Sequence, residues 1–332
     1  MSYFKIVLSI FRTNQLLFTL LILPYLFLIR ISSFTEPLIG TDVGSGILSK
    51  FVYQVLPLNS LYAHIGALFL IFFQSLIINI ICGRFKIFDE PNQLCGLFYA
   101  MLCSMFPEFL WLSPVLMANT FLLFALFELF EIYDKKAGAG SIFNIGFFIG
   151  IASLFYFPAI ILIFFALVGL GIQRTFTIKE ALMILIGAFV PFYLLFTYFY
   201  WNDSLDYFKK MQFENGLKLF QPDFQFKNSS FIEIGIVCLM LVIFLININR
   251  LGIKRNIQIL KIQKLLYWWI LIIPFGLMLG GKVHIDYLLM FMLPSSFLLT
   301  YVFLSMKKQW ADALHLIIIT FIIVFQYIKY LL

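Results

Sequence analysis

The residues of this chain that could do chemistry are few, and the first group follows the first apolar run. Arg30 is followed by two carboxylates, Glu36 and Asp42, in a stretch with glycines at 40, 44 and 46. A carboxylate can serve as a general base or hold a metal ion, and a guanidinium can hold a phosphate. Asp42, with Glu36 as second choice, is therefore our candidate general base or metal-assisting acid. Arg30 is the candidate phosphate-binding cation.

A second polar group precedes a late apolar run and contains Lys282, His284 and Asp286. If this group opens a helix, Lys282 and Asp286 stand at positions i and i+4 and share one face. Asp286 would then suit the positive end of the helix dipole. We expect His284 to assist proton transfer and Lys282 to hold phosphate. His64 and Glu108 begin or interrupt other apolar runs and complete the set of scarce polar residues.

Each of these residues also has a simpler interpretation. Polar side chains often end transmembrane helices in the water layer, and each residue taken singly fits that role. As a set they are more specific, because they combine acids, a base and cations. The sequence has no Walker motif and no His/Cys spacing typical of a metal site, so it identifies no cofactor. The carboxylates could still bind a divalent cation.

The composition places these residues in a membrane protein. Hydrophobic residues make up 63% of the 332 residues and charged residues 12%, against about 25% charged residues in ordinary soluble domains. Apolar runs of about 20 residues, the length that crosses a hydrocarbon core of about 30 Å, recur throughout the chain. The sequence therefore predicts one integral membrane domain over residues 1–332, an all-α polytopic transmembrane helical bundle, and excludes a soluble protein.

We expect about eleven crossings, and two of the apolar stretches are too long for one crossing each. Residues 93–133 would reach about 60 Å as a single helix, so the interruption from Pro107 to Pro114 should divide them at the outer face. Residues 141–172 carry Pro158 at their centre and basic residues beyond both ends, which predicts two short crossings or a re-entrant hairpin. The other expected spans are 15–31, 61–82, 181–201, 231–248, 265–278, 285–305 and 314–330.

The basic residues set the predicted orientation. With the N-terminus inside and the C-terminus outside, 15 of the 23 Lys and Arg residues fall on the cytoplasmic side, as the positive-inside rule requires. Residues 32–60 and 202–230 then form two large outer loops. The scarce polar residues fall at this outer face, namely Arg30, Glu36, Asp42, His64, Glu108, Lys282, His284 and Asp286.

Two basic segments are expected to contact lipid headgroups on the cytoplasmic side. Residues 1–14 read as a short amphipathic interfacial helix, and residues 250–264 read as a basic amphipathic helix. Anionic lipid rather than nucleic acid is the expected partner of the second segment.

Three features together resemble a known architecture. They are the acidic outer loop after the first span, the hairpin Gly150-Ile-Ala-Ser-Leu-Phe-Tyr-Phe-Pro158-Ala, and the late span Lys282-Val-His284-Ile-Asp-Tyr-Leu-Leu-Met-Phe-Met-Leu-Pro294. This combination is similar to the polytopic glycosyltransferases of the GT-C class. The chain as a whole also resembles an uncharacterised bacterial integral-membrane family that shares the hairpin and the start Arg12-Thr-Asn-Gln-Leu-Leu.

The GT-C resemblance implies a particular fold and chemistry. It implies a GT-C-like helix arrangement, a polyprenyl-phosphate sugar as substrate, and a catalytic carboxylate in the first outer loop, where Glu36 and Asp42 are available. The loop lacks the adjacent acidic pair often found in that class.

The sequence leaves three functions open for a protein of the bacterial inner membrane. The first is a lipid-linked sugar transferase working at the periplasmic face. The second is a non-catalytic subunit of an envelope assembly or secretion complex, with other membrane proteins as partners. The third is a lipid or solute carrier. An enzyme should gather the polar residues near one outward cavity, whereas a subunit should show an apolar groove or docking face.

Overall fold

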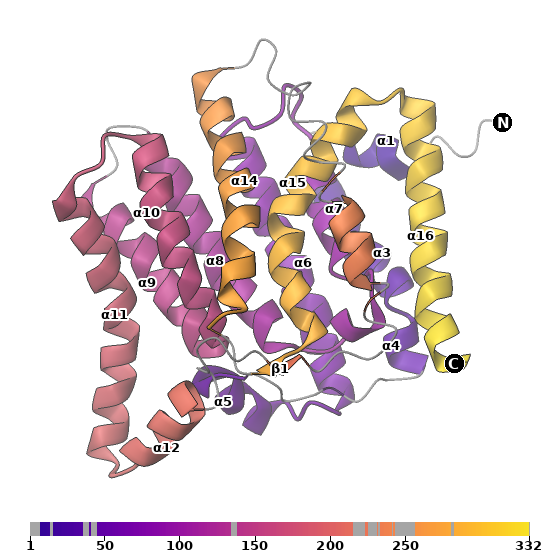
Figure 1. The fold of residues 1–332 in the computed structure, drawn as a ribbon. Coiled ribbons are helices and arrows are strands. Elements are labelled where there is room, and N and C mark those ends of the chain that lie inside the picture. The colour runs from indigo at the N-terminus through magenta and orange to yellow at the C-terminus, as the bar shows by residue number, and fades with distance from the viewer. Residues whose placement is uncertain are drawn as a thin grey trace.

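The chain folds into a bundle of roughly antiparallel helices in a computed structural model (Figure 1). The structure describes residues 7–13, 16–35, 40, 45–133, 138–214, 223–224, 231, 233–240, 242, 256–279 and 282–331. Within these residues the only strands are β1 (Asp223–Phe224) and β2 (Lys282–Val283), which pair in parallel. The predicted helical class is therefore confirmed. Glu36 and Asp42 lie outside the described residues.

Within the described residues, six helices are long and apolar enough to cross a membrane, so the protein is a multi-spanning membrane protein. They are α6 (Leu61–Arg84), α8 (Pro114–Glu131), α11 (Ile178–Trp201), α14 (Ile257–Gly276), the 3₁₀ turn η5 (Ile285–Leu288) with α15 (Leu289–Ser305), and α16 (Lys308–Leu331). Shorter apolar helical stretches cover Leu17–Ile29, Ala139–Phe155 and Phe157–Gln173. At about 1.5 Å per residue, 17 residues span about 26 Å, close to the core thickness. Length alone therefore leaves the count of eleven crossings a prediction.

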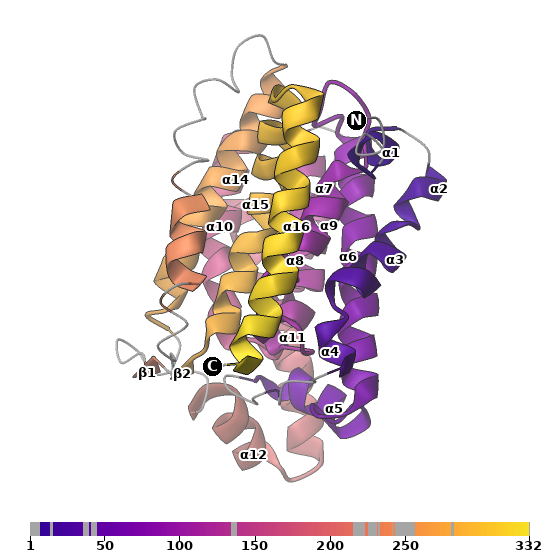
Figure 2. The same ribbon diagram turned by 90° about the vertical axis from the view of Figure 1, so that its right-hand side faces the viewer.

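The two ends of the bundle differ in character. At one end, here called the basic end, α6 finishes at Arg84, α10 (Leu162–Gln173) is followed by Arg174, and Lys307 precedes α16. The opposite end, here called the loop end, carries α4 (Ser32–Thr35), α5 (Ile47–Val55) and α12 (Leu205–Lys209). Figures 1 and 2 show α1 (Val7–Phe11) at the basic end and the last turns of α16 at the loop end. The predicted orientation, with the basic end on the cytoplasmic side, is based on this group of basic residues.

Proline residues interrupt the chain where the sequence predicts. After α7 (Leu94–Leu102), the chain forms a short 3₁₀ turn, η2 (Pro107–Phe109), and α8 then begins at Pro114 with Ser113 as its N-cap. Proline lacks an N–H, so it is tolerated in the first turn of a helix and breaks an ongoing one. The same rule ends α9 (Ala139–Phe155) before the turn η3 (Phe157–Ile161), which contains Pro158 and leads into α10.

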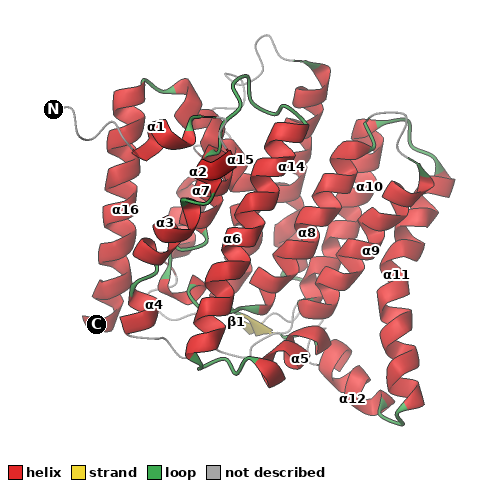
Figure 3. Ribbon diagram, turned by 180° about the vertical axis from the view of Figure 1, so that it is seen from behind, coloured by secondary structure: helices red, strands yellow, loops and turns green. Residues whose placement is uncertain are grey.

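The α9–α10 hairpin returns to the end from which it started, and α11 packs closely against it (Figure 3). Gly146 and Gly150 of α9 face Ala188 of α11, and Gly187 of α11 faces the α9 backbone at Phe143 and Phe147. A Cβ atom at Gly146 would overlap the carbonyl of Ile184. Small residues therefore allow backbone-to-backbone contact, which is the usual way that membrane helices associate.

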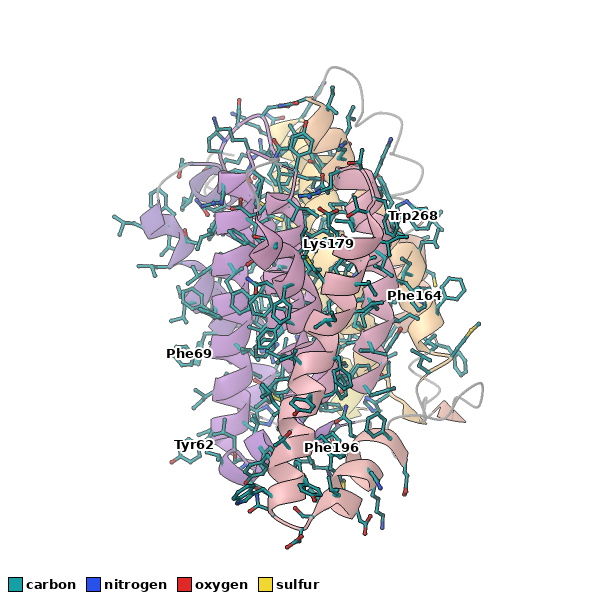
Figure 4. The ribbon with its side chains drawn as sticks, turned by 90° about the vertical axis from the view of Figure 1, so that its left-hand side faces the viewer. Tyr62, Phe69, Phe164, Lys179, Phe196 and Trp268 are labelled. Atoms are coloured by element: carbon teal, nitrogen blue, oxygen red, sulfur yellow. The ribbon has the colours of Figure 1, made fainter. Side chains whose placement is uncertain are left out.

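Apolar side chains cover the outside of the bundle. Among the long helices, α8 and α15 are the most buried, and α11 and α16 expose most of their length. Figure 4 shows Tyr62, Phe69, Phe164 and Trp268 pointing away from the helices, and all four are at least 41% exposed. Such a surface is stable only in contact with lipid or with other apolar surfaces.

One predicted boundary differs from the structure. The expected basic helix over residues 250–264 and the expected span over 265–278 are not separate elements, because α14 runs continuously from Ile257 to Gly276. Nothing between these residues breaks a helix except Pro274 near its end. Lys261 and Lys264 therefore belong to the first two turns of a long helix. Residues 250–255 lie outside the described part of the chain.

Candidate functional site

The scarce polar residues converge on the segment that links α7 to α8. This segment, residues 107–112, turns through η2 at the loop end and is buried along its whole length. A turn this short leaves some of its carbonyl groups without a backbone N–H partner. Side chains of other elements donate hydrogen bonds to these carbonyl groups. Glu108 lies on this segment and is 6% exposed.

Arg30, at the end of α3 (Ile22–Ile29), is fully buried and holds the segment in place. Its Nη1 donates to the carbonyl of Cys103 (3.2 Å) and to Ser104 Oγ (3.4 Å). Its Nη2 donates to the carbonyls of Phe109 (3.2 Å) and Leu110 (2.7 Å). A guanidinium has four Nη hydrogens, and all four are used here. The geometry therefore gives Arg30 a structural role and does not support the predicted contact with phosphate.

His64, in the first turn of α6, is bound to the same segment. Its Nδ1 lies 3.3 Å from the carbonyl oxygen of Leu110, and the residue is 1% exposed. A carbonyl can only accept, so Nδ1 carries a proton and donates this hydrogen bond. Arg30 and His64 thus come together at Leu110.

Asp286 and His284 lie on the other side of the segment. Trp111 Nε1 donates a hydrogen bond of 2.9 Å to Asp286 Oδ2, and Asp286 is 4% exposed. His284 Nδ1 is 3.4 Å from Asp286 Oδ1, an ion-pair distance at which the hydrogen-bond geometry is poor. The imidazole also lies against the indole of Trp111, with 5.5 Å between ring centroids. A carboxylate and an imidazole in contact are an arrangement that can move a proton.

The amphipathic helix α5 contacts the 107–112 segment beside this pair. Tyr53 of α5 donates its hydroxyl to the carbonyl of Leu112 at 3.0 Å. Burial raises the pKa of the Tyr53 phenol, and the negative charge of Asp286 raises it further. Tyr53 is therefore close enough to Asp286 to respond to its charge, so the first outer loop reaches the polar cluster.

Glu233 is a second buried carboxylate near Asp286. It is fully buried in the helical stretch 233–240, and its charge interacts with that of Asp286. Our sequence reasoning missed Glu233, and it also missed Trp111 and Tyr53. Glu233 could have been found, because a carboxylate inside the predicted span 231–248 is costly and usually functional. Trp111 and Tyr53 carry no comparable signal, since the chain is 19% aromatic.

Lys282 does not share a helix face with Asp286, contrary to our expectation. Its backbone lies in β2, paired in register with Asp223 of β1, and the next residues are extended until η5 begins at Ile285. The two glycines at 280 and 281 explain the difference, because glycine is a poor helix former and favours an extended or turning backbone. The pairing brings the second outer loop beside the start of the late span.

The first outer loop is anchored at the loop end by hydrogen bonds to the α9–α10 hairpin. Gly46 N and Ser49 Oγ both donate to the carbonyl of Phe155, at 2.8 and 2.6 Å. Gln212, which is fully buried in the second outer loop, accepts from Ile47 N and donates to the carbonyl of Ser153. Both outer loops and the hairpin are therefore tied together.

Gly40 places the middle of the first outer loop against the cluster. A Cβ built on Gly40 would lie 3.5 Å from Trp111 Cγ, so residue 40 lies against the indole that binds Asp286. Residue 40 stands between Glu36 and Asp42 in the sequence, and both of these lie outside the described residues. The structure thus brings Arg30, His64, His284 and Asp286 together around residues 107–112, the segment that carries Glu108.

Two apolar grooves open near the cluster. One, here called the α5 groove, has a volume of about 310 Å³ and is lined by Val52, Leu56, Gly66, Leu70, Leu112, Met117, Thr120, Phe121 and Phe155. The other has a volume of about 520 Å³ and is lined by Leu23, Pro24, Phe27, Phe34, Leu61, Ile65, Leu68 and Phe69. Leu112 belongs both to the α5 groove and to the segment that carries Trp111, so the groove adjoins the polar cluster.

The described residues contain no group of three or more His, Cys, Asp or Glu side chains that could hold a metal ion. Glu36 and Asp42, the predicted metal-assisting groups, are outside these residues. The chain matches no protein-family model, no curated protein and no solved structure.

Proposed function

We propose that the protein is a membrane transferase that acts on a lipid-linked sugar at its loop end. The observation that carries this proposal is the position of Asp286. Asp286 accepts a hydrogen bond from Trp111, and the next residue in the chain, Leu112, lines the α5 groove. A lipid chain in the groove would bring the group attached to it to the carboxylate and imidazole.

The α5 groove suits the apolar part of such a substrate. It lies between the interfacial helix α5 and the spanning helices α6 and α8, and among the described residues that line it Thr120 alone has a polar side chain. Its volume is at the lower end of the range of about 300 to 1,000 Å³ typical of small-molecule sites. That volume fits one isoprenoid tail, with the rest of a longer tail in the bilayer.

The buried carboxylates supply the chemistry in this proposal. An acceptor hydroxyl loses its proton to a carboxylate and forms a bond to the sugar C1, while the bond from C1 to the phosphate oxygen breaks and the lipid phosphate leaves. Asp286 with His284 is one candidate base. Asp42 is the other candidate, because it follows Gly40 by two residues in the sequence and Gly40 lies against Trp111.

The charged groups divide between structural and substrate-binding roles. Arg30 supports the 107–112 segment, so Lys282 is the remaining candidate from the sequence for contact with the lipid phosphate. Its backbone in β2 lies two residues before His284.

A second function, a non-catalytic subunit, is favoured by a different observation. The helix α11 is mostly exposed and carries a row of exposed aromatic side chains, including Phe189, Tyr193 and Tyr200. A partner membrane protein could cover this face. Lipid covers such a face equally well, so we favour the transferase, which the buried polar cluster supports.

The test is substitution of Asp286 by Asn in the native host, with the abundance of the protein monitored. Asp206→Asn is the matched control, because Asp206 is exposed on α12 at the same end. We expect Asp286→Asn to abolish an envelope glycan at normal protein abundance, and Asp206→Asn to leave it unchanged. Unaltered glycans in both Asp286→Asn and Asp42→Asn would contradict the transferase and leave the subunit function.

A further inference from the structure

A large cavity opens at the basic end, far from the polar cluster of the loop end. Its volume is about 1130 Å³, and it lies between the ends of α8 and α10 and the start of α14. Its lining includes Tyr133, Gln173, Arg174, Phe176 and Lys261. No part of the proposed transferase mechanism uses this cavity.

The cavity carries net positive charge among its described residues. Lys261 Nζ donates to the carbonyl of Gln173 at 2.8 Å and lies 5.1 Å from the centre of the Tyr133 ring. Both partners are neutral, so they hold the ammonium group in position without cancelling its charge. Arg174, also in the lining, forms an ion pair with Glu180. The ammonium of Lys261 is therefore the group best placed to attract an anion.

Gln173, which also lines the cavity, has a buried side-chain acceptor. Its side chain is 2% exposed, and its Nε2 donates to the carbonyl of Leu129 at 3.3 Å. Its Oε1 has no hydrogen-bond partner among the described residues. A buried acceptor without a partner is unfavourable, and such atoms commonly bind a ligand hydroxyl or a water molecule.

We propose that this cavity binds a phosphate ester that carries a free hydroxyl group. The phosphate would contact Lys261, the hydroxyl would donate to Gln173 Oε1, and the aromatic rings of Tyr133 and Phe176 would bound the site. Basic pockets between membrane helices bind anionic headgroups in this way. Two kinds of ligand carry both a phosphate ester and a free hydroxyl group. One is the headgroup of an anionic phospholipid, and the other is a soluble sugar phosphate or glycerol phosphate.

Binding measurements on the purified full-length protein distinguish the two kinds of ligand. Native mass spectrometry compares binding of phosphatidylglycerol with binding of phosphatidylcholine and so tests for a lipid headgroup. Calorimetry with glycerol phosphate tests for binding of the soluble ligand. We expect one of these phosphates to bind, and Lys261→Met to weaken that binding about tenfold, the effect of losing one charge-assisted hydrogen bond. Lys264→Met is the matched control, because Lys264 is exposed on the next turn of α14 and should leave binding unchanged.

A second variant allows the proposal to be tested even if Lys261→Met does not fold. Thr175 is exposed and lines the cavity, so Thr175→Glu adds a negative charge without disturbing the core and should also weaken binding. The proposal is overturned if neither phosphate binds to the wild-type protein. It is equally overturned if folded Lys261→Met and Thr175→Glu bind as well as Lys264→Met.

Discussion

Arg30 and His64 bind the same oxygen atom, the carbonyl of Leu110. Arg30 Nη2 donates to it at 2.7 Å and His64 Nδ1 lies 3.3 Å from it, and both residues are buried. One residue further along the chain, Trp111 binds Asp286. The position of Asp286 therefore depends on Arg30, through the segment that both of them contact.

Replacing Arg30 should destabilise the protein. Arg30→Met removes four hydrogen bonds to buried oxygen atoms, although the carbonyl of Leu110 keeps its contact with His64, and this should cost about 3 to 5 kcal/mol, as breaking a buried charged network does. The measurement is thermal unfolding of the purified protein in detergent. Arg84→Met is the control, because Arg84 is exposed, pairs with Glu131 at the basic end, and should cost less than about 1 kcal/mol. Equal melting temperatures for the two variants would contradict the structural role of Arg30.

The contact between α9 and α11 should be sensitive to side-chain size. Gly146→Val places a side chain where the carbonyl of Ile184 lies, so we expect a loss of about 2 kcal/mol or more from overpacking. Gly140 is on the same helix, and a methyl group added there would have no other atom within 4 Å. Gly140→Ala should therefore be neutral or stabilising by up to about 1 kcal/mol. Thermal unfolding again gives the comparison. A stable Gly146→Val variant would mean that the two helices are not in backbone contact.

The last helix should depend on one glutamine. Gln326 of α16 accepts from Ser32 Oγ and donates to the carbonyl of Ser104, both at 2.6 Å. Gln326→Leu removes both bonds and leaves two buried groups unpaired, which should cost about 1 to 3 kcal/mol. Gln309→Leu, at an exposed site on the same helix, should change little. The measurement is the rate at which limited proteolysis releases α16. A faster release from Gln326→Leu than from the wild-type protein and Gln309→Leu would agree with this role, and equal rates for all three proteins would contradict it.

The two ends of the bundle should face opposite sides of the membrane. Cysteine placed at Thr175, between α10 and α11, should be protected from a membrane-impermeant reagent added to intact cells. Cysteine placed at Asn202, after α11, should be labelled. The basis is the positive-inside rule applied to the basic end. Labelling of both positions, or of neither, would show that α11 does not cross the membrane.

The breaks in the chain could be predicted from the sequence, because proline acts locally. Pro107, Pro114 and Pro158 each mark an interruption that the structure contains. The gathering of Arg30, His64 and Asp286 at one end could also be predicted, since topology alone places them there.

The partners of these residues could not be predicted. The sequence predicts a carboxylate or phosphate as the partner of Arg30, yet Arg30 binds carbonyl groups at the end of α7 and at the turn η2, 73 to 80 residues later. Such contacts depend on tertiary packing, which has no local signal. The spacing of Lys282 and Asp286 fits a helix, but Lys282 pairs with Asp223 and is extended. The sequence does not predict the continuity of α14, because a change from charged to apolar residues can also mark the end of a helix.

The most direct test of the transferase proposal is the lipid bound to the purified protein, measured by native mass spectrometry after mild extraction from the native host. Gly66 lines the α5 groove, and a Cβ there would lie 3.6 Å from Leu56, so Gly66→Leu fills the groove without a backbone clash. Gly83 is on the same helix with open space around it, so Gly83→Leu is the control. We predict a polyprenyl-phosphate lipid on the wild-type and Gly83→Leu proteins, reduced about tenfold or more on Gly66→Leu. Absence of such a lipid from the wild-type protein, or equal amounts on all three proteins, would contradict the proposal.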